Sequence, residues 1–287
     1  MIDVVMPTYN RIDSLRSVIQ SYMTQENLGK FIIVDDFSAE DVPSFVKEME
    51  VIYPDKIIYK RMDKKTTLPN IRNVGIELAK NEYIFMGEDD VLLPKDHFKI
   101  LLEKMKEFDA DLIAGRRIYL RTGQSAEEAK RIADLDKSPL FVRIPFEGYF
   151  ERYIERPMEV CFLHSNILMK RNVFEKVQYD PAYGGNAFRE ELDFFLRVHD
   201  EGFHLWIIPD TLSYHLKGTA VNIKGGSRKK RIVYEFQVWK NTIRCFFKNR
   251  KIFKKEFKVK NIFLFTLRSL LARYSYAIKR RISWYKK

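Results

Sequence analysis

The sequence predicts an α/β fold, in which helices cover both faces of a mostly parallel sheet, followed by a basic helical C-terminal extension. Short runs rich in β-branched residues alternate with segments whose apolar residues recur at helical spacing. This alternation is typical of parallel sheets. The 287 residues, 46% of them hydrophobic, are enough for one large domain and an extension. Residues 228–287 hold 20 Lys+Arg and 2 Asp+Glu, whereas residues 1–227 hold 31 and 37.

The first part of the chain gives the clearest alternation. Residues 2–7 form a β-branched run that ends at Pro7, and residues 10–25 have a helical apolar period. Further strands are predicted at residues 31–36, 56–62, 82–90 and 111–120, and the helices between them at residues 42–53, 68–80 and 95–108. Ligands bind to such sheets at the carboxyl ends of the strands. Two acidic clusters, Asp35–Asp36 and Glu88–Asp90, are expected at those ends.

The following part is less regular. It predicts a surface helix at residues 124–135, then a strand, a basic turn and a short helix within residues 163–177. A helix is expected at residues 188–202 and a strand at residues 203–210. The remaining segment, residues 213–231, reads as a basic loop with adjacent glycines and contains His215. Such a loop could close over a bound diphosphate, or it could be a simple linker.

The acidic clusters raise a question of charge. Neighbouring carboxylates repel each other, and a buried carboxylate is costly unless something offsets its charge. Solvated turn residues that cap the next helices are one interpretation of each cluster. The other is a site for a hard divalent cation, Mg²⁺ or Mn²⁺, which prefers oxygen ligands. Because Mg²⁺ usually shares its ligands with phosphates, a nucleotide diphosphate is the natural partner.

Five segments in this order resemble glycosyltransferase family 2, the inverting GT-A enzymes that use sugar nucleotides. They are "VVMPTYNR", "FIIVDDFS", "LPNIRNVGIELAKNEYIFMGEDD", "LHSNILMKRNVFEKV" and "EELDFFLRV", and the match covers residues 2–216. The resemblance implies a Rossmann-like GT-A sheet in a catalytic domain at residues 1–220. About residues 1–115 would bind the nucleotide sugar, and residues 116–220 would supply the acceptor side and the base. Residues 221–287 would be a basic loop and an amphipathic helical tail.

The resemblance also implies a donor site. The turn after the first strand would hold the base, an acid after the second strand would accept the N–H of uracil, and further residues would contact ribose and phosphates. These nucleotide-sugar positions are Pro7, Thr8, Tyr9, Asn10, Arg11, Asp35, Asp36, Arg72 and Asp89. Asp90 would coordinate the Mn²⁺ or Mg²⁺ that bridges the diphosphate, with Glu88 and His215 as the other candidate ligands. The alternatives are a helix cap for Asp36 and a surface arginine for Arg72.

The family's catalytic base matches Glu191 of the pair Glu190–Glu191. A base must take the proton of the acceptor hydroxyl as that oxygen attacks the anomeric carbon. Attack opposite the leaving group gives inversion. A glutamate in place of the family's common aspartate adds a methylene group. The alternative is that both acids complement the helix dipole. His164 falls on an acceptor-side position, where a structural role is equally open.

The tail predicts a basic amphipathic helix. Its apolar residues 263, 267, 270, 271, 274 and 278 fit one helical face, and many lysines and arginines surround them. Such a helix is typical of peripheral contact with an anionic membrane. Packing on the catalytic domain, an oligomer contact and a nucleic-acid arm are the alternatives. The favoured partners are a nucleotide-diphosphate sugar and a glycan or lipid-linked acceptor, with no nucleic acid.

The sequence therefore favours an inverting, metal-assisted glycosyltransferase with a donor that is UDP-linked. A nucleotidyltransferase would usually carry a glycine-rich loop after the first strand, and "MPTYNR" has no glycine. A nucleic-acid-binding protein would leave both acidic clusters unexplained, and the retained acids argue against a sugar-binding relative without turnover. Two cysteines in no CxxC pattern, and no apolar run long enough to span a bilayer, favour a cytoplasmic enzyme, peripheral at the inner face of the membrane.

Overall fold

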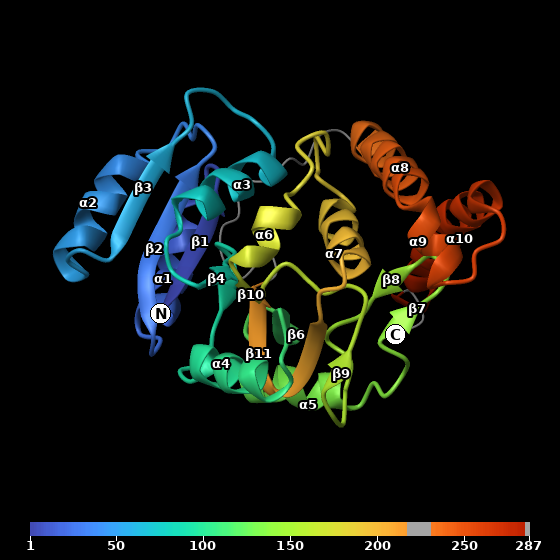
Figure 1. The fold of residues 1–287 in the computed structure, drawn as a ribbon, viewed down its shortest axis with the longest axis horizontal. Coiled ribbons are helices and arrows are strands. Elements are labelled where there is room, and N and C mark those ends of the chain that lie inside the picture. The colour runs from blue at the N-terminus through green and yellow to red at the C-terminus, as the bar shows by residue number, and fades with distance from the viewer. Residues whose placement is uncertain (217–230, 285–287) are drawn as a thin grey trace.

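The computed structural model describes residues 1–216 and 231–284 of the chain, so the predicted basic loop at residues 217–230 lies outside the described residues. A nine-stranded sheet forms the centre (Figure 1). Its strands are β1 (Ile2–Thr8), β2 (Leu28–Asp35), β3 (Ile57–Arg61), β4 (Tyr83–Met86), β5 (Val91–Leu92), β6 (Leu112–Leu120), β9 (Met158–Glu159), β10 (Leu168–Lys170) and β11 (Leu205–Leu216). A small hairpin, β7 (Phe141–Val142) and β8 (Glu147–Gly148), stands apart from it.

The strand order is β3-β2-β1-β4-β10-β6-β11-β5, with β9 also paired to β11. The pairs among β1 to β4 and the pair β6–β11 are parallel. Strand β10 enters antiparallel between β4 and β6, and β5 and β9 are antiparallel to β11. The prediction of a mostly parallel sheet is confirmed, and the carboxyl ends of β1, β2 and β4 meet at one edge.

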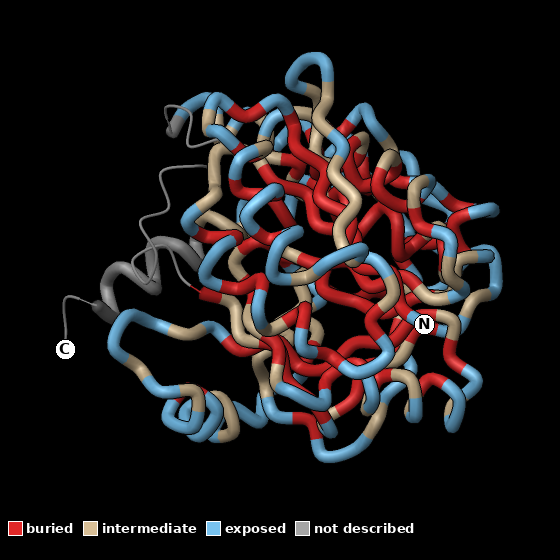
Figure 2. Tube along the Cα trace, turned by 90° about the vertical axis from the view of Figure 1, so that its left-hand side faces the viewer, coloured by how far each residue is buried: buried red, intermediate tan, exposed pale blue. Residues whose placement is uncertain are grey.

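Helices cover both faces of this sheet. Those within the catalytic part are α1 (Ile12–Met23), α2 (Val42–Ile52), α3 (Leu68–Leu78), α4 (His97–Glu107), α5 (Ala126–Asp134), α6 (Asn172–Lys176) and α7 (Glu190–Asp200). Strand β1 shows why there are two layers: Val4 and Met6 pack with α1, α2 and α4, whereas Val5 packs with α3, α6 and α7. The strands at the centre of the sheet are accordingly buried, whereas β3 is half-buried, β9 is exposed and the turns at the periphery are exposed (Figure 2).

Two strand predictions need correction. The predicted strand at residues 82–90 ends at Met86, because the chain turns there and the Val91 amide donates to the Glu88 carbonyl at 3.2 Å. His215 was expected in a loop but lies within β11. A bulge between Ile208 and Leu212 lets β11 continue beside β6, and His215 then pairs with Val91 of β5. Tertiary pairing therefore extends a strand that the sequence predicts to end at residue 210.

The C-terminal extension packs on the catalytic part. It comprises α8 (Arg231–Lys248), α9 (Arg250–Lys255) and α10 (Ile262–Trp284). Phe246, Phe253 and Phe265 from these three helices surround Phe146, which follows the β7 strand, with ring centroids 4.9 to 5.9 Å away. Among the described residues, no helix is long and apolar enough to cross a membrane.

Candidate active site

The three consecutive acids occupy a turn whose backbone is held from two sides. Helix α1 supplies Ser14, whose hydroxyl donates to the Asp89 carbonyl at 2.6 Å, and Tyr22, whose hydroxyl donates to the Glu88 carbonyl at 3.1 Å. The Leu216 amide at the end of β11 donates to the Asp90 carbonyl at 2.8 Å. Elements far apart in sequence thus fix the direction of all three carboxylates.

Two arginines offset the charge of these acids. Arg11 lies 3.1 Å from Asp89 and 2.7 Å from Asp90 through its two terminal nitrogens. Arg117 of β6 lies 2.6 Å from the Glu88 carboxylate. Burial acts to raise all three pKa values. At Glu88, however, Arg117, His215 and the Ser165 hydrogen bond together lower the pKa below its usual value. At Asp89 burial prevails over Arg11 and raises the pKa to about 7.

Asp90 is the acid best placed for a cation. One of its oxygens accepts from Arg11, and the other lies 3.6 Å from Nε2 of His215. The second ring nitrogen of His215, Nδ1, is buried without a hydrogen-bond partner among the described residues. Within those residues, no three His, Cys, Asp or Glu side chains are arranged to hold a metal ion. Asp90 and His215 therefore offer one carboxylate oxygen and one imidazole nitrogen to a cation, while Arg11 occupies the other oxygen of Asp90.

Glu88 is less suited to this role. One oxygen of its carboxylate accepts from the Ser165 hydroxyl at 2.6 Å, and the other forms the ion pair with Arg117. Glu88 is thus held by Ser165 and Arg117, whereas one oxygen of Asp90 faces His215.

A cavity of about 420 Å³ opens beside these acids. Its wall contains Pro7, Thr8, Tyr9, Arg11, Asp36, Arg72, Asp89, Asp90 and His215, which brings together most of the predicted donor positions. One oxygen of Asp36 accepts from the Thr66 amide at 2.7 Å and from its hydroxyl at 2.9 Å, while the other is 3.6 Å from Lys65. The Lys65 ammonium also lies 2.9 Å from the centre of the Tyr9 ring.

Asn10 and Asp35 are not in this wall. The Asn10 side chain accepts from the Ala39 amide at 2.7 Å, and its backbone has a positive φ of 51°. Asp35 accepts from the Ser38 amide at 2.8 Å and from the Tyr59 hydroxyl at 3.0 Å. Both side chains accept hydrogen bonds from the loop after β2, and so they position this loop without lining the cavity.

Arg72 connects this cavity to Glu190 and Glu191. Its guanidinium forms ion pairs with both carboxylates, at 2.9 Å to Glu191. Glu190 is buried, whereas the Glu191 side chain is 33% exposed. Burial raises the pKa of Glu190 to about 8, against the opposing effect of Arg72. The side chain with access to solvent, and so to an incoming molecule, is Glu191.

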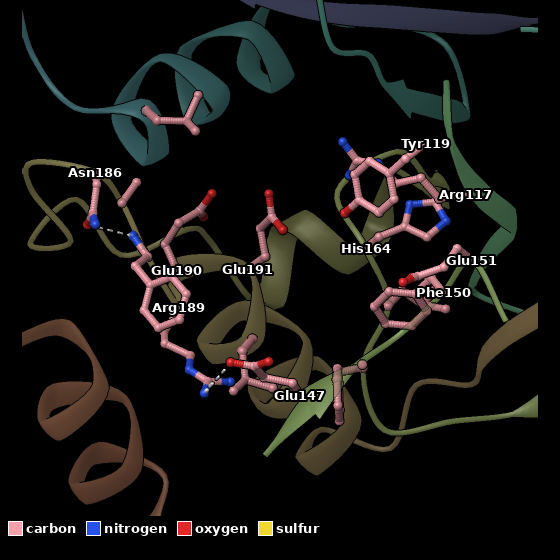
Figure 3. Close-up of a pocket in the computed structure, with 17 residues that line it drawn as sticks. Arg117, Tyr119, Glu147, Phe150, Glu151, His164, Asn186, Arg189, Glu190 and Glu191 are labelled. Carbon is pink, nitrogen blue, oxygen red and sulfur yellow. Dashed lines mark hydrogen bonds and ion pairs between the residues drawn. The ribbon is translucent and has the colours of Figure 1, made fainter. Parts of the chain in front are cut away.

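A second cavity, of about 400 Å³, lies on the other side of Glu191. Glu190 and Glu191 project into it from the start of α7, and Tyr119, Arg117 and His164 line the opposite wall (Figure 3). The two cavities adjoin, because Leu68, Asn186 and Ala187 line both. Glu191 therefore stands close to the border between them.

His164 is tied to the backbone. Its Nε2 lies 2.8 Å from the Gly115 carbonyl, and its Nδ1 accepts from the Asn166 amide at 3.2 Å. Burial lowers its pKa to about 4. With both nitrogens engaged, the imidazole lines the second cavity as a neutral wall.

Sequence reasoning missed Arg117, Ser165 and Lys65, which complete the charge and hydrogen-bond pattern of the site. Arg117 did carry a signal, since "GRR" interrupts a strand that is otherwise apolar, and a buried charge needs a partner. Its neighbour Arg116 finds Asp134 at 2.6 Å, on the other side of β6. Nothing in the sequence pattern pairs Arg117 with Glu88 in particular.

The sequence model of Glycosyl transferase family 2 matches residues 3–178, which is more than half of the chain. The chain belongs to this family. Its match ends before α7, so the position of Glu191 rests on the structure described above.

Two curated relatives of family 2 are similar over part of their length. The poly(ribitol-phosphate) β-N-acetylglucosaminyltransferase TarP of Staphylococcus aureus is 28% identical over 134 residues, 45% of this chain and 40% of TarP. Glycosyltransferase GlyG of Streptococcus pneumoniae is 24% identical over 115 residues, 40% of this chain and 38% of GlyG. The match thus spans less than half the length of each relative.

Solved structures confirm the fold. S. aureus TarS 1-349 in complex with UDP-GlcNAc aligns with a TM-score of 0.62 at 14% identity, over 85% of this chain and 65% of that one. GalNAc-T7 with UDP, GalNAc and Mn²⁺ aligns with a TM-score of 0.61 at 14% identity, over 75% and 44%. The GT-A prediction for this family 2 chain is therefore confirmed.

Proposed function

We propose that this chain transfers a sugar from a UDP-sugar to an acceptor hydroxyl, with inversion at the anomeric carbon. The observation that carries the proposal is the junction of two cavities at Arg72 and Glu191. Arg72 lines the cavity that contains the acid cluster, and it binds Glu191, which lines the other. A donor in the first cavity and an acceptor in the second would meet beside a carboxylate. This geometry supports direct transfer between two bound substrates.

The donor's base is proposed to bind between Tyr9 and Asp36. An ionised carboxylate only accepts hydrogen bonds, so it suits the imide N–H of uracil. One oxygen of Asp36 is engaged by Thr66, and the other lies 3.6 Å from the Lys65 ammonium. Asp89 already accepts from the Thr8 hydroxyl at 3.0 Å, and we assign it to the ribose. The UDP-bound TarS and GalNAc-T7 structures support a uridine nucleotide by analogy of fold.

Glu191 is proposed as the general base. Its partial exposure gives it access to an acceptor hydroxyl, and Arg72 holds it in place. The carboxylate would take the proton as the hydroxyl oxygen attacks the anomeric carbon. Glu190 is buried behind it and serves to hold Arg72.

Asp90 and His215 are proposed to hold a Mn²⁺ or Mg²⁺ ion together with the donor's diphosphate. When bound, such an ion supplies Lewis-acid stabilisation of the departing diphosphate. Arg11 lies within reach of the same place and would bind a phosphate oxygen after leaving Asp90.

The acceptor is proposed to be a glycan, either free or lipid-linked. The rings of Phe150 and Tyr119 line the second cavity. Four glutamates and two arginines line it as well: Glu147, Glu151, Glu190, Glu191, Arg117 and Arg189. Carboxylates and aromatic rings suit a neutral sugar ring better than a phosphate group. We propose that the enzyme works in the cytoplasm, where nucleotide sugars are available.

Calorimetric titration with UDP and GDP, in Mn²⁺ and in EDTA, tests the donor site. The wild type should bind UDP more tightly than GDP, and its affinity for UDP should be lower in EDTA than in Mn²⁺. Asp36→Asn should lose the preference for UDP, and Asp90→Ala should lose the metal dependence. Asp63→Asn, an exposed acid on the neighbouring loop, is the matched control. No nucleotide binding under any condition would refute the assignment of this cavity.

Turnover tests the base. Glu191→Gln should bind UDP like the wild type but lower the rate of sugar transfer by about 10² to 10⁴-fold. Asp200→Asn, an exposed acid at the far end of the same helix, should leave the rate unchanged. Release of sugar 1-phosphate without free UDP, with the UMP group carried to the acceptor, would show nucleotidyl transfer and refute the proposed reaction.

A further inference from the structure

The C-terminal helices carry an apolar surface that the catalytic site does not use. Along α8, exposed apolar side chains recur every three or four residues: Ile232, Phe236, Trp239, Ile243 and Phe247. Phe236 is 68% exposed, although phenylalanine side chains are usually buried. The opposite side of α8 packs on the catalytic part through Val238 and Cys245, which are fully buried, and the neighbouring Phe246 is buried as well. The helix therefore has one buried apolar side and a second apolar side that stays exposed, apart from the contact of Trp239 with Tyr274 of α10.

Helix α10 continues this surface. Phe263, Leu264, Leu267 and Leu271 are all exposed, and Phe263 reaches 64%. The sequence predicted one apolar face that included Leu270, but Leu270 is buried against the protein, so the exposed face is turned away from it. Phe263, Leu267 and Leu271 of the predicted face are therefore exposed, and Leu270 is its buried member.

The two helices run antiparallel and side by side. At one end, the Trp239 indole donates to the Tyr274 hydroxyl at 2.6 Å, and at the other the rings of Phe246 and Phe265 are 5.5 Å apart. A hollow of about 490 Å³ lies among the exposed apolar side chains of α8 and is lined by Phe236, Trp239, Ile243, Glu235 and Lys240. We call the exposed apolar side chains of α8 and α10 together the docking surface.

The charge around the docking surface is strongly positive. Residues 231–274 contain 12 lysines and arginines and 2 acids. Both acids are engaged: Glu235 accepts from the Tyr274 hydroxyl at 2.9 Å, and Glu256 pairs with Lys255 at 3.2 Å. Exposed bases follow one another between the two stripes: Arg250, Lys251, Lys254, Lys255, Lys258 and Lys260. An occupant must therefore be apolar at the centre and anionic at its edge.

We propose that the docking surface binds a bilayer containing anionic lipids, with α8 and α10 lying in the plane of the interface. Basic amphipathic helices bind membranes in this way, with apolar side chains at the boundary of headgroups and acyl chains. Each lysine or arginine near an anionic leaflet adds favourable electrostatic energy. A second copy of the chain would bring like charges together, and a nucleic acid would leave the apolar side chains exposed to water.

The docking surface lies beside the active site without being part of it. Gln237 on α8 accepts from the Asn186 amide at 3.0 Å, and Asn186 lines both cavities. A docked molecule would hold these cavities close to the lipid surface. The docking itself does not require that the chain be a glycosyltransferase.

Vesicle flotation with the full-length chain tests the proposal, independently of turnover. The wild type should bind phosphatidylcholine vesicles that contain 30% phosphatidylglycerol, and bind pure phosphatidylcholine at least tenfold more weakly. Phe236→Asp/Phe263→Asp should lower binding to the anionic vesicles at least tenfold. Val51→Asp, which alters an 85% exposed valine on α2, should bind like the wild type. Thermal melting checks that each variant is folded.

A second variant tests the charge. Lys254→Gln/Lys255→Gln/Lys258→Gln should weaken binding to anionic vesicles severalfold, and 0.5 M NaCl should do the same to the wild type. The proposal would be overturned if Phe236→Asp/Phe263→Asp bound anionic vesicles as well as the wild type does, or if the wild type did not bind them. A stable dimer that the aspartate variant disrupts would also overturn it, because the surface would then be an interface between copies.

Discussion

Replacing Arg72 by methionine removes the cation that both Glu190 and Glu191 share. Methionine keeps most of the length of the arginine stem, so little volume is lost. The Arg72 and Glu190 side chains are 3% and 2% exposed, and one Glu190 oxygen already lacks a hydrogen-bond partner among the described residues. Removing the charged donor of a buried hydrogen bond is costly, because the acceptor that remains stays desolvated without a partner.

The cost should depend on pH in a particular way. A hydrogen bond to a charged group contributes about 1.5–3 kcal/mol, so Arg72→Met should lower the free energy of unfolding by about 2–3 kcal/mol at pH 7. Burial raises the pKa of Glu190 to about 8, above its value in the unfolded chain. Its contribution is therefore fully present below the unfolded pKa and is lost as pH rises toward 8. Without Arg72 the folded pKa rises further, so the variant keeps losing stability above pH 8.

The difference in the free energy of unfolding between wild type and Arg72→Met should thus be constant below pH 8 and increase above pH 8. The growth is about 1.4 kcal/mol per pH unit, which gives a total of about 5 kcal/mol near pH 10. Urea unfolding at pH 6, 7, 8, 9 and 10, followed by circular dichroism, measures it. Arg16→Met, which breaks an exposed pair with Glu48, is the matched control and should cost less than 1 kcal/mol at every pH.

The double variant Arg72→Met/Glu190→Gln removes the titrating group and should show no growth above pH 8. If the difference between Arg72→Met and wild type instead grows from about pH 5, Glu190 is ionised in the neutral wild type, and the reasoning about its burial is refuted. A loss below 1 kcal/mol at every pH would show that this pair is not a buried one in solution.

Three other perturbations follow from particular contacts. Gly115→Ala would place a Cβ atom 2.5 Å from the Thr211 carbonyl oxygen and should cost about 1–3 kcal/mol in urea unfolding, whereas Gly184→Ala meets nothing within 4 Å and should be neutral. Lys248→Met removes a 2.9 Å ion pair to the fully buried Asp193 on α7 and should cost about 1–2 kcal/mol, with the exposed Lys251→Met as control. Mn²⁺ alone should bind weakly in calorimetry and at least tenfold more tightly with UDP, because Arg11 competes for Asp90; equal affinity with and without UDP would contradict this.

The order of strands and helices could be predicted from local pattern, because each element buries one clear apolar face. Strand β2 is an apolar run with two carboxylates at its end, and α3 shows its helical period in "LPNIRNVGIEL". The limits of β11 could not be predicted in this way. Its last residues depend on pairing with β5 and β6 across a bulge, and that pairing is set by residues about 100 positions away.

The site was predicted in the same uneven way. The acid positions followed from strand ends and from the family resemblance, and most of them do line one cavity. The arginines that offset them come from a loop, from α3 and from β6, and no local pattern assigns Arg117 to Glu88 or Arg72 to Glu190. Which arginine pairs with which acid depends on the tertiary structure, since several arrangements of the elements would be compatible with the same sequence pattern.

These arginines change what the row of three acids means. Acidic residues in a row at a strand end seemed to require a cation from solution, yet Arg117 and Arg11 already supply opposite charge within 3.1 Å. The number of acids therefore does not by itself indicate a metal. The distinguishing feature is Asp90, where one oxygen lies 3.6 Å from Nε2 of His215 and the other accepts from Arg11. A ligand with positive charge facing Asp90 and negative charge facing Arg11 would pair with both side chains. A metal-bound diphosphate has that distribution of charge.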